Sequence, residues 1–262
     1  MTDKILPPST DAPAEGPDPT EKPFVAHLLE LRNRLLRTLA CVAILLLALM
    51  PFSNDIYHWL AAPLLDVMPG STGMIATQVA SPFLAPFKLT VFVAIFIAVP
   101  YIFYQGWAFV APGLYLHEKK LALPMLISST LLFYVGIAFA YYVVFPLVFG
   151  FFTAIAPEGV TVMTDIGHYL DFVLMLFLAF GVAFEVPVAT YLLVKTGITT
   201  TQSLASKRPY VIVGAFTAGM LLTPPDVISQ TLLALPMWIL YEIGMLLCRL
   251  TIKEDQSEEE TA

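Results

Sequence analysis

Long apolar runs separated by short polar or proline-rich breaks dominate this chain of 262 residues. Several of these runs reach the roughly 20 residues that an α-helix needs to cross a ~30 Å hydrocarbon core. The pattern therefore predicts an all-α integral membrane protein with six transmembrane helices. These helices are expected at about residues 35–52, 83–104, 121–149, 169–194, 210–222 and 227–247.

The fifth run, residues 210–222, extends only ~20 Å as a helix, so it either re-enters the membrane or crosses it where the bilayer is thinned. If it crosses, twelve of the thirteen Lys and Arg residues fall on one side, and loops 53–82, 148–168 and 223–226 contain none. Lys88 is the exception, and its aliphatic stem can extend to the interface. The positive-inside rule then predicts six spans with both termini in the cytoplasm.

Prolines recur within these runs or at their ends, and an interior proline removes a backbone hydrogen bond and bends the helix. Membrane helices tolerate such prolines without functional consequence. Alternatively, the bent helices form a concave, cupped bundle, which is the arrangement we expect. The prolines concerned are Pro100, Pro124, Pro146, Pro187 and Pro236.

Charge is concentrated in the two ends of the chain. Only 13% of all residues are charged, about half the share in a soluble protein. Residues 1–22 hold two basic and five acidic residues, and residues 253–262 hold one basic and five acidic residues. We expect a disordered cytoplasmic tail at 1–23, with no secretory signal, a membrane domain at 24–250 and an acidic cytoplasmic tail at 251–262.

Motifs for nucleotide binding, hydrolysis and dinucleotide binding are absent from the sequence. Cys41 and Cys248 lie in apolar runs and suggest no disulfide, and the four histidines lack metal-ligand spacing. We therefore expect no catalytic residues, no metal, no cofactor and no nucleic-acid partner.

An amphipathic segment, FVAHLLELRNRLLRTLA, precedes the first run. Leu28, Leu31 and Leu35 form one stripe at helical spacing, and Glu30 and Arg34 share the opposite face. The pattern predicts a helix lying at the cytoplasmic interface. Glu30 either pairs with Arg34 one turn away or is an interfacial anion available to a cationic peptide.

A second acidic position follows the second run, in WAFVAPGLYLHEKK. Pro112 and Gly113 break the helix there, and Glu118 lies beside Lys119 and Lys120 on the same expected face. Taken alone, each of these acids is typical of a solvated membrane interface.

Six segments occur in the order known from the TatC family, the polytopic core subunit of the twin-arginine protein translocase. The resemblance extends from about Phe24 to Arg249 and leaves out both tails. The segments are HLLELRNRLL, SPFLAPFKL, WAFVAPGLYLHEKK, FGVAFEVPV, KRPY and MLLTPPDVISQ.

This resemblance implies a bacterial inner-membrane receptor for the twin-arginine signal peptides of folded proteins. Carboxylates matching Glu30 and Glu118 contact the arginine pair in the family, and Phe109 resembles a wall of the same site. A guanidinium group is always charged and matches a carboxylate fork, whereas lysine does not. The flanking basic residues, Arg34 among them, would repel the signal and are expected to anchor the protein to anionic lipid.

Glu185 lies inside the apolar segment FLAFGVAFEVPVATYLLVK, ~15 Å of helix from Lys195 and near the bilayer midplane. Pro187 leaves the carbonyl of Ala183 without its helical partner. A charge at this depth costs at least a few kcal/mol. Glu185 is either a neutral carboxyl bonded to its own helix or, as the resemblance implies, a polar partner for another membrane helix on the concave side.

The resemblance also assigns Gln230 and Thr223 to this polar surface. Single-span subunits, TatB-like and TatA-like, would dock along the short fifth run near Met220 and form a multimeric receptor complex. Asp226 is an expected N-cap of the sixth helix after two prolines, within a motif that is functionally sensitive in the family.

The sequence thus predicts a protein translocase subunit, not an enzyme, that draws on the proton motive force at ~2.3 kcal/mol per charge per 100 mV. A secondary transporter with Glu185 as a proton relay is the main alternative, with Glu242 as a weaker second carboxylate. Such transporters usually contain internal repeats, and none is detectable here. An intramembrane hydrolase would need a nucleophile–base pair at one depth, which the sequence lacks.

Overall fold

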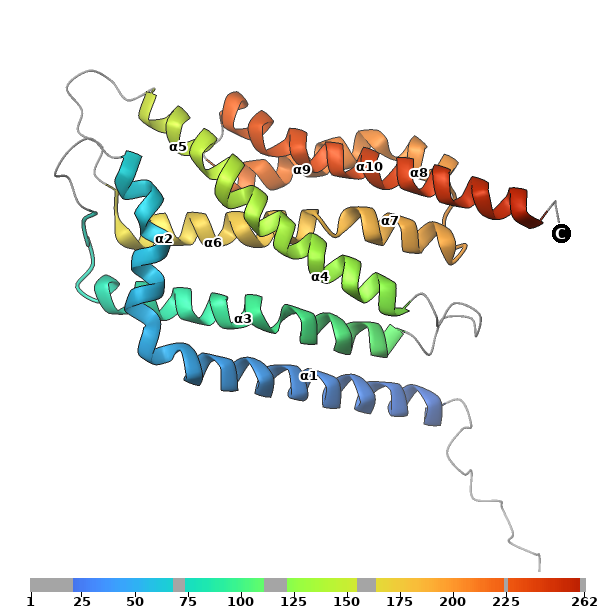
Figure 1. Ribbon diagram of the computed structural model, residues 1–262, viewed down its shortest axis with the longest axis horizontal. Helices are drawn as coiled ribbons and strands as arrows, with labels where there is room; N and C mark the ends of the chain where they lie inside the picture. The colour runs from blue at the N-terminus through green and yellow to red at the C-terminus, as the bar shows by residue number, and fades with distance from the viewer. Residues whose placement is uncertain (1–20, 68–73, 111–121, 155–163, 224–225, 260–262) are drawn as a thin grey trace, which may run out of the picture.

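A computed structural model of the protein describes residues 21–67, 74–110, 122–154, 164–223 and 226–259. These residues are almost entirely helical (Figure 1), and their β-pairing is limited to one bridge between Ile75 and Asp165. The first helices are α1 (Glu21–Leu49), a 3-10 turn (Met50–Phe52), α2 (Ser53–Val67), α3 (Ser81–Val110) and α4 (Ala122–Phe139). After a π-helical turn (Ala140–Val144) come α5 (Phe145–Ala154), α6 (Ile166–Ala183), α7 (Val186–Lys195), α8 (Thr201–Ser206), α9 (Arg208–Leu222) and α10 (Val227–Glu259).

Five helical stretches of the described chain are long and apolar enough to cross a membrane. The shorter α9, at 15 residues, spans roughly 22 Å. It packs along α10 and runs in the opposite direction (Figure 1). It is one continuous helix from Arg208 to Leu222. The five long stretches are His27–Ala61, Ser81–Phe109, Leu123–Phe152, Ile166–Lys195 and Val227–Thr251.

Helix α1 continues without a break from the amphipathic segment into the first apolar run. The expectation of a separate helix lying along the interface was wrong, because no proline or glycine interrupts residues 24–49. Helix α1 packs chiefly against α3, at the edge of the bundle (Figure 1). Its other side exposes apolar residues such as Leu39 and Leu47, which suits contact with lipid.

The prolines act differently according to their position. Pro146 cannot donate to the carbonyl of Tyr142, and the π-helical turn occupies this place between α4 and α5. Pro187 lies in the first turn of α7, after an interruption of the helix at Phe184 and Glu185. Pro124 stands in the first turn of α4, where an amide donor is not needed. The predicted break at Pro187 is thus confirmed.

Helix α2 forms where the sequence analysis expected part of a loop, residues 53–82. It crosses the end of the bundle, over the ends of α3 and α6 (Figure 1). The Trp59 ring stacks on Tyr141 with centroids 5.6 Å apart, and the Tyr169 hydroxyl donates to the carbonyl of Leu60 at 3.2 Å. Contacts with residues far away in the sequence therefore hold α2 in place. The pattern of polar and apolar residues within α2 does not reveal such contacts.

The core centres on α6, which packs against α3, α4 and the π-helical turn. Glycines permit the closest approach. A Cβ on Gly136 of α4 would lie 2.6 Å from the carbonyl oxygen of Phe180, and one on Gly181 would lie 2.6 Å from the ring of Phe133. Small residues at such contacts are typical of membrane helix pairs. The largest fully buried side chains of α6 are Phe180, Leu170, Leu174, Leu176 and Val173.

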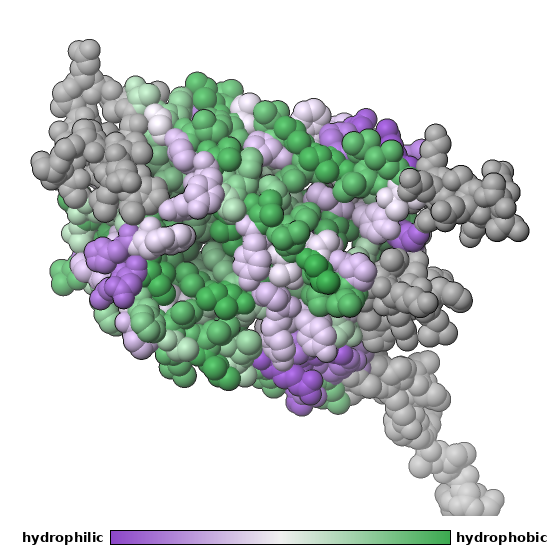
Figure 2. Space-filling model, in the orientation of Figure 1, coloured by the Kyte–Doolittle hydropathy of each residue, from purple (hydrophilic) through white to green (hydrophobic). Residues whose placement is uncertain are grey.

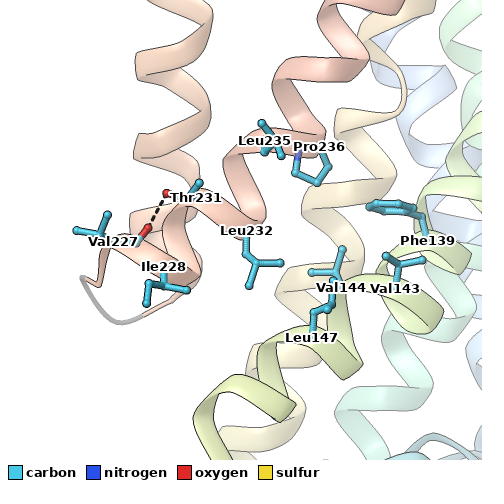
Figure 3. Close-up of a pocket in the computed structure, with 10 residues that line it drawn as sticks. All are labelled: Phe139, Val143, Val144, Leu147, Val227, Ile228, Thr231, Leu232, Leu235 and Pro236. Atoms are coloured by element: carbon cyan, nitrogen blue, oxygen red, sulfur yellow. Dashed lines mark hydrogen bonds between the residues drawn. The ribbon is translucent and has the colours of Figure 1, made fainter. Parts of the chain in front are cut away.

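Two hollows lie between α4–α5 on one side and the last helices on the other. The first, of about 480 Å³, has apolar side chains of α10 facing those of α4, the π-helical turn and α5 (Figure 3). Its one hydroxyl, on Thr231, donates to the carbonyl of Val227 at 2.6 Å (Figure 3). The second, of about 370 Å³, is bounded by α4, α7 and α10, with Ser128, Pro187 and Tyr191 in its wall. Together they give this face the concave form that the prolines suggested.

The surface separates into an apolar middle and polar ends. Hydrophobic side chains cover the middle of the visible face, and hydrophilic ones gather toward its two ends (Figure 2). We call the end at which α1 and α4 begin and α3 and α7 end the basic end (Figure 1), because Lys195 is the last residue of α7 and Lys207 lies between α8 and α9 there. The opposite end is the one that α2 covers.

Candidate functional site

The candidate site at the basic end is built on α1 and α3 around Glu30. Arg34 donates to Glu30 Oε1 from Nε at 3.0 Å and from Nη2 at 2.6 Å. Its Nη1 donates to Oε1 of Gln105 on α3 at 3.2 Å, and Gln105 Nε2 donates in turn to the Tyr101 hydroxyl at 2.7 Å. These four side chains are called the Glu30 site below.

Helical spacing places this network. Glu30 and Arg34 lie one turn apart on α1, and Tyr101 and Gln105 lie one turn apart on α3, so the two pairs face each other where the helices pack. Gln105 is buried, whereas the side chains of Arg34 and Glu30 are 21% and 39% exposed. The carboxylate is therefore the more accessible partner.

An aromatic contact closes the same region. The ring of His27 stacks on Phe109 with centroids 4.2 Å apart and planes at 20°. Because His27 precedes Glu30 by about one turn, Phe109 of α3 borders the Glu30 site; a role for its ring in signal binding stays a prediction. Glu118 and Pro112, the other residues expected here, lie outside the described residues.

The role expected for Arg34 was wrong. Its guanidinium turns toward Glu30 and Gln105 instead of extending toward lipid headgroups. The pairing of Glu30 with Arg34, left open by the sequence, is confirmed. Both bonds to Glu30 end on Oε1, so Arg34 does not engage the two carboxylate oxygens as a bidentate fork would.

A second candidate centre is Glu185, at the junction of α6 and α7. Its carboxyl group lies beside the side chain of Ser129, which is buried on α4. Of the two alternatives left open by the sequence, a bond within its own helix is not observed, and the helix is interrupted there. Oxygen Oε1 of Glu185 is buried and has no partner among the described residues. An unpaired oxygen in an apolar environment is costly, so Glu185 can receive a donor from a partner.

The polar residues of α9 and α10 lie apart from Glu185, at the end that α2 covers. Thr223 is buried and its hydroxyl donates to the carbonyl of Gly219 at 3.0 Å. Gly219 itself lies against α10, because a Cβ there would be 3.3 Å from the carbonyl oxygen of Gln230. Met220 is 51% exposed on the outer surface of α9. The contacts of Glu185 are with α4, so the expected single polar surface is divided between two places.

Asp226 is the N-cap of α10, as expected. Its Oδ1 accepts a hydrogen bond from the backbone amide of Ser229 at 2.7 Å. This geometry satisfies one of the free amides in the first turn of the helix. The buried Oδ2 of Asp226 and the buried hydroxyl of Ser229 have no partner among the described residues.

Two charged contacts at the same end were not predicted. Lys88 of α3, whose stem was expected to extend to the interface, forms an ion pair with Asp171 of α6. The signal was present in the sequence, because one basic and one acidic residue occur near the outer ends of two different apolar runs.

Asp165 holds the second unpredicted contact. Its carboxylate accepts from the hydroxyl of Thr77 at 2.6 Å and from the amide of Thr77 at 2.9 Å, and it caps α6 through Gly167 and His168. The hydroxyl bond from Thr77, together with these amides, holds the pKa of the Asp165 carboxyl well below its ordinary value. Asp165 thereby fastens the segment before α3 to the start of α6.

Glu242, considered as a second proton-relay group, has a structural partner. It pairs with Arg208 at the start of α9, with Nε and Oε1 2.7 Å apart. The adjacent Tyr241 donates from its hydroxyl to the carbonyl of Leu204 at 2.7 Å. Two successive residues of α10 thus hold α8 and the start of α9, and this arrangement weakens the transporter alternative.

Comparison with known proteins identifies the family. The family model for the Sec-independent protein translocase protein (TatC) matches residues 26–236. The chain belongs to the TatC family. Its relative from Haemophilus influenzae, the Sec-independent protein translocase protein TatC, is 63% identical over 237 residues, covering 90% of this chain and 93% of the relative. The relative of the same name from Escherichia coli (strain K12) is 56% identical over 239 residues, covering 91% and 93%.

A solved structure of a TatC protein also matches this chain. The crystal structure of the twin arginine translocase receptor TatC superimposes with a TM-score of 0.77 at 39% identity, covering 86% of this chain and 98% of that chain. The all-α membrane class predicted from the hydrophobic pattern is confirmed. This TatC-family chain is a subunit of a protein translocase. It is a twin-arginine translocase receptor and not an enzyme.

Proposed function

We propose that this chain recognises the twin-arginine signal peptides of folded precursor proteins at the cytoplasmic face of the bacterial inner membrane. The Glu30 site carries the proposal, because its carboxylate already binds a guanidinium group beside an aromatic wall. The similarity to a solved twin arginine translocase receptor supports the same role. An incoming arginine would bind Glu30 through the same guanidinium–carboxylate contact that Arg34 makes.

The charge distribution supports a cytoplasmic location of the basic end. Arg32, Arg34 and Arg37 lie along α1, Lys207 stands between α8 and α9, and Arg208 begins α9. Lys and Arg accumulate on the cytoplasmic side of bacterial inner-membrane proteins. We propose that both termini lie on that side and that the chain crosses the membrane six times.

Glu118 and Phe109 complete the proposed signal site. Segment 111–121, which contains Glu118 and Pro112, connects the end of α3 to the start of α4. Both of those helix ends belong to the basic end of the bundle (Figure 1). A charged hydrogen bond contributes about 1.5–3 kcal/mol, so two carboxylates suffice to discriminate two arginines from one.

Partner subunits of the translocase form the second part of the proposal. The outer surface of α9 exposes Met220, Val213 and Leu221, and Glu185 has an oxygen with no donor among the described residues. Single-span TatB-like and TatA-like helices would pack along α9, with Gln230 and Thr223 near its end, and would supply a polar group to Glu185. The assembled receptor is then multimeric.

The proposed energy source is the proton motive force, worth ~2.3 kcal/mol per charge per 100 mV. The ~22 Å length of α9 is shorter than the ~30 Å hydrocarbon core, which favours local thinning of the bilayer. Thinning at α9 would lower the barrier to a folded domain passing beside it.

Site-specific cross-linking to a twin-arginine signal peptide tests the signal site. The Glu30→Gln and Glu118→Gln variants keep size and hydrogen-bonding shape but lose charge, and each should reduce cross-linking about tenfold or more. The matched control, Glu185→Gln, removes a carboxylate from the middle of the bundle and should leave cross-linking unchanged. Undiminished cross-linking in the Glu30→Gln/Glu118→Gln double variant rejects the site.

Co-purification tests the partner site. Glu185→Ala should lower the yield of single-span partners without reducing signal capture, because it removes the polar group that a partner helix would meet. Uptake of a small solute into vesicles that depends on Glu185 would instead favour the secondary transporter.

A further inference from the structure

Arg34 holds a position within the Glu30 site that a signal arginine would need. We propose that Arg34 is an internal competitor: it occupies Glu30 while no signal is bound, and a signal arginine displaces it toward Gln105. The inference rests on the proposed function of Glu30 as a signal-binding carboxylate. Arg34 thereby becomes a residue that sets the affinity of the Glu30 site for an incoming arginine.

The first support is the geometry of the contact. Arg34 approaches Glu30 through two nitrogens that both end on Oε1. The carboxylate is more exposed than the guanidinium that it binds, at 39% against 21% of the side chain. A peptide guanidinium can therefore approach Glu30 from solvent without any movement of α1.

The second support is the alternative acceptor for Arg34. Its Nη1 already donates to Gln105 Oε1 at 3.2 Å. The Gln105 amide is buried and is oriented by the bond from its Nε2 to Tyr101, so its oxygen faces Arg34. When Glu30 exchanges partners, Arg34 retains this neutral acceptor within an otherwise apolar helix pair.

A consequence for affinity follows from counting contacts. A signal arginine at Glu30 replaces one guanidinium–carboxylate contact by another, so this exchange adds little net affinity. Removal of Arg34 should therefore raise the affinity for a peptide whose arginine reaches Glu30.

Peptide binding to the purified full-length protein in lipid nanodiscs tests the competition. The probes are a fluorescent signal peptide with two arginines and the same peptide with one arginine replaced by lysine. In Arg34→Gln, we expect about two- to fivefold tighter binding of both probes, because a part-exposed ion pair no longer competes.

The matched control is Arg37→Gln, which removes the same charge from an exposed position of α1. It should change the affinity for the two-arginine probe less than Arg34→Gln does. An equal effect in Arg34→Gln and Arg37→Gln would mean general charge repulsion and would overturn the inference, as would weaker or unchanged binding in Arg34→Gln.

Gln105→Leu provides an independent variant that retains both Arg34 and Glu30. It should weaken binding of the two-arginine probe, because the displaced Arg34 has lost its acceptor; unchanged or tighter binding contradicts the inference. Glu30→Gln separates the competition from the proposed function. If it leaves binding intact, the proposed function fails; if it weakens binding while Arg34→Gln brings no gain, only the competition fails.

Discussion

At the residue scale, the polar groups inside the apolar helices differ in how they find partners. Hydroxyls such as those of Thr90 and Thr130 donate to the carbonyl four residues earlier and need nothing from a neighbour. Glu185 cannot do this, because a carboxylate accepts and the helix around it is interrupted. Its unpaired oxygen makes it a position where a partner can contribute a donor.

Asp165 gives a prediction about pH. Because its folded pKa is lowered, its contribution to stability is present at neutral pH and is lost as the pH falls below the ordinary carboxyl value of about 3.9. Between about pH 6 and pH 3, the unmodified protein should lose more thermal stability than the Asp165→Asn variant. Asparagine can still cap α6, but it carries no charge that acid could remove. Melting curves in detergent measure this difference, and parallel losses in both proteins would contradict it.

Tyr241 gives a prediction about a single hydrogen bond. Tyr241→Phe removes the bond to the Leu204 carbonyl, which keeps a second bond from the amide of Lys207. The free energy of unfolding should therefore fall by only about 1 kcal/mol. Tyr142→Phe, at a position 71% exposed, is the control and should change stability by less than ~0.5 kcal/mol. A loss as large in the control would remove the assigned role of the hydroxyl.

At the element scale, close approach between helices determines the bundle more than individual side chains do. Helices α4 and α6 meet at Gly136, and α10 meets α7 at Gly244, where a Cβ would lie 2.4 Å from Thr190 Oγ1. Lipid offers apolar side chains the same environment as a neighbouring helix, so tight packing has to hold such pairs together. Glycine is required at these contacts for its size.

This packing predicts the effect of adding one methyl group. Gly136→Ala would push a Cβ against the backbone of Phe180 and should destabilise the protein by about 1–3 kcal/mol. Gly106→Ala makes the same change in α3, where nothing lies within 4 Å, and should be neutral or stabilising by up to ~1 kcal/mol. Denaturation of the two variants in detergent compares them directly. Similar stability of both would show that α4 and α6 can separate slightly without cost.

At the scale of the whole molecule, the two ends of the bundle have different tasks. The basic end combines Glu30, Arg34 and Phe109. The other end is fastened by Asp165, by the Lys88–Asp171 pair and by α2. Between them, the hollows beside α4–α5 offer apolar surface within the proposed membrane region. Signal capture and partner assembly are thus expected at different depths.

Thiol labelling tests this arrangement. In a background of Cys41→Ser and Cys248→Ala, a membrane-impermeant reagent added to intact cells that lack an outer-membrane barrier should label Val79→Cys and not Ser206→Cys. Both positions are exposed and lie at opposite ends of the bundle. Inverted vesicles should reverse the result, since the proposed orientation places the basic end in the cytoplasm. Labelling of both variants from one side would refute the topology.

The hydrophobic pattern alone determined the membrane class and the approximate position of each long apolar helix. A lipid environment requires long apolar segments whose backbone hydrogen bonds are made within the segment. It also indicated Glu30, Glu185 and the cap at Asp226. Helix α2 was missed, since its position depends on contacts with Tyr141 and Tyr169, far away in the sequence.

Only the tertiary structure decided the partners of the polar groups. Local spacing offered Arg34 to Glu30, but the contact with Gln105 requires α1 and α3 to pack in one register. Glu185 turns to α4 and Lys88 to α6 for the same reason. Periodicity specifies which face of a helix is polar. The facing helix then specifies which atom meets that face, and this information becomes available only when the bundle is assembled.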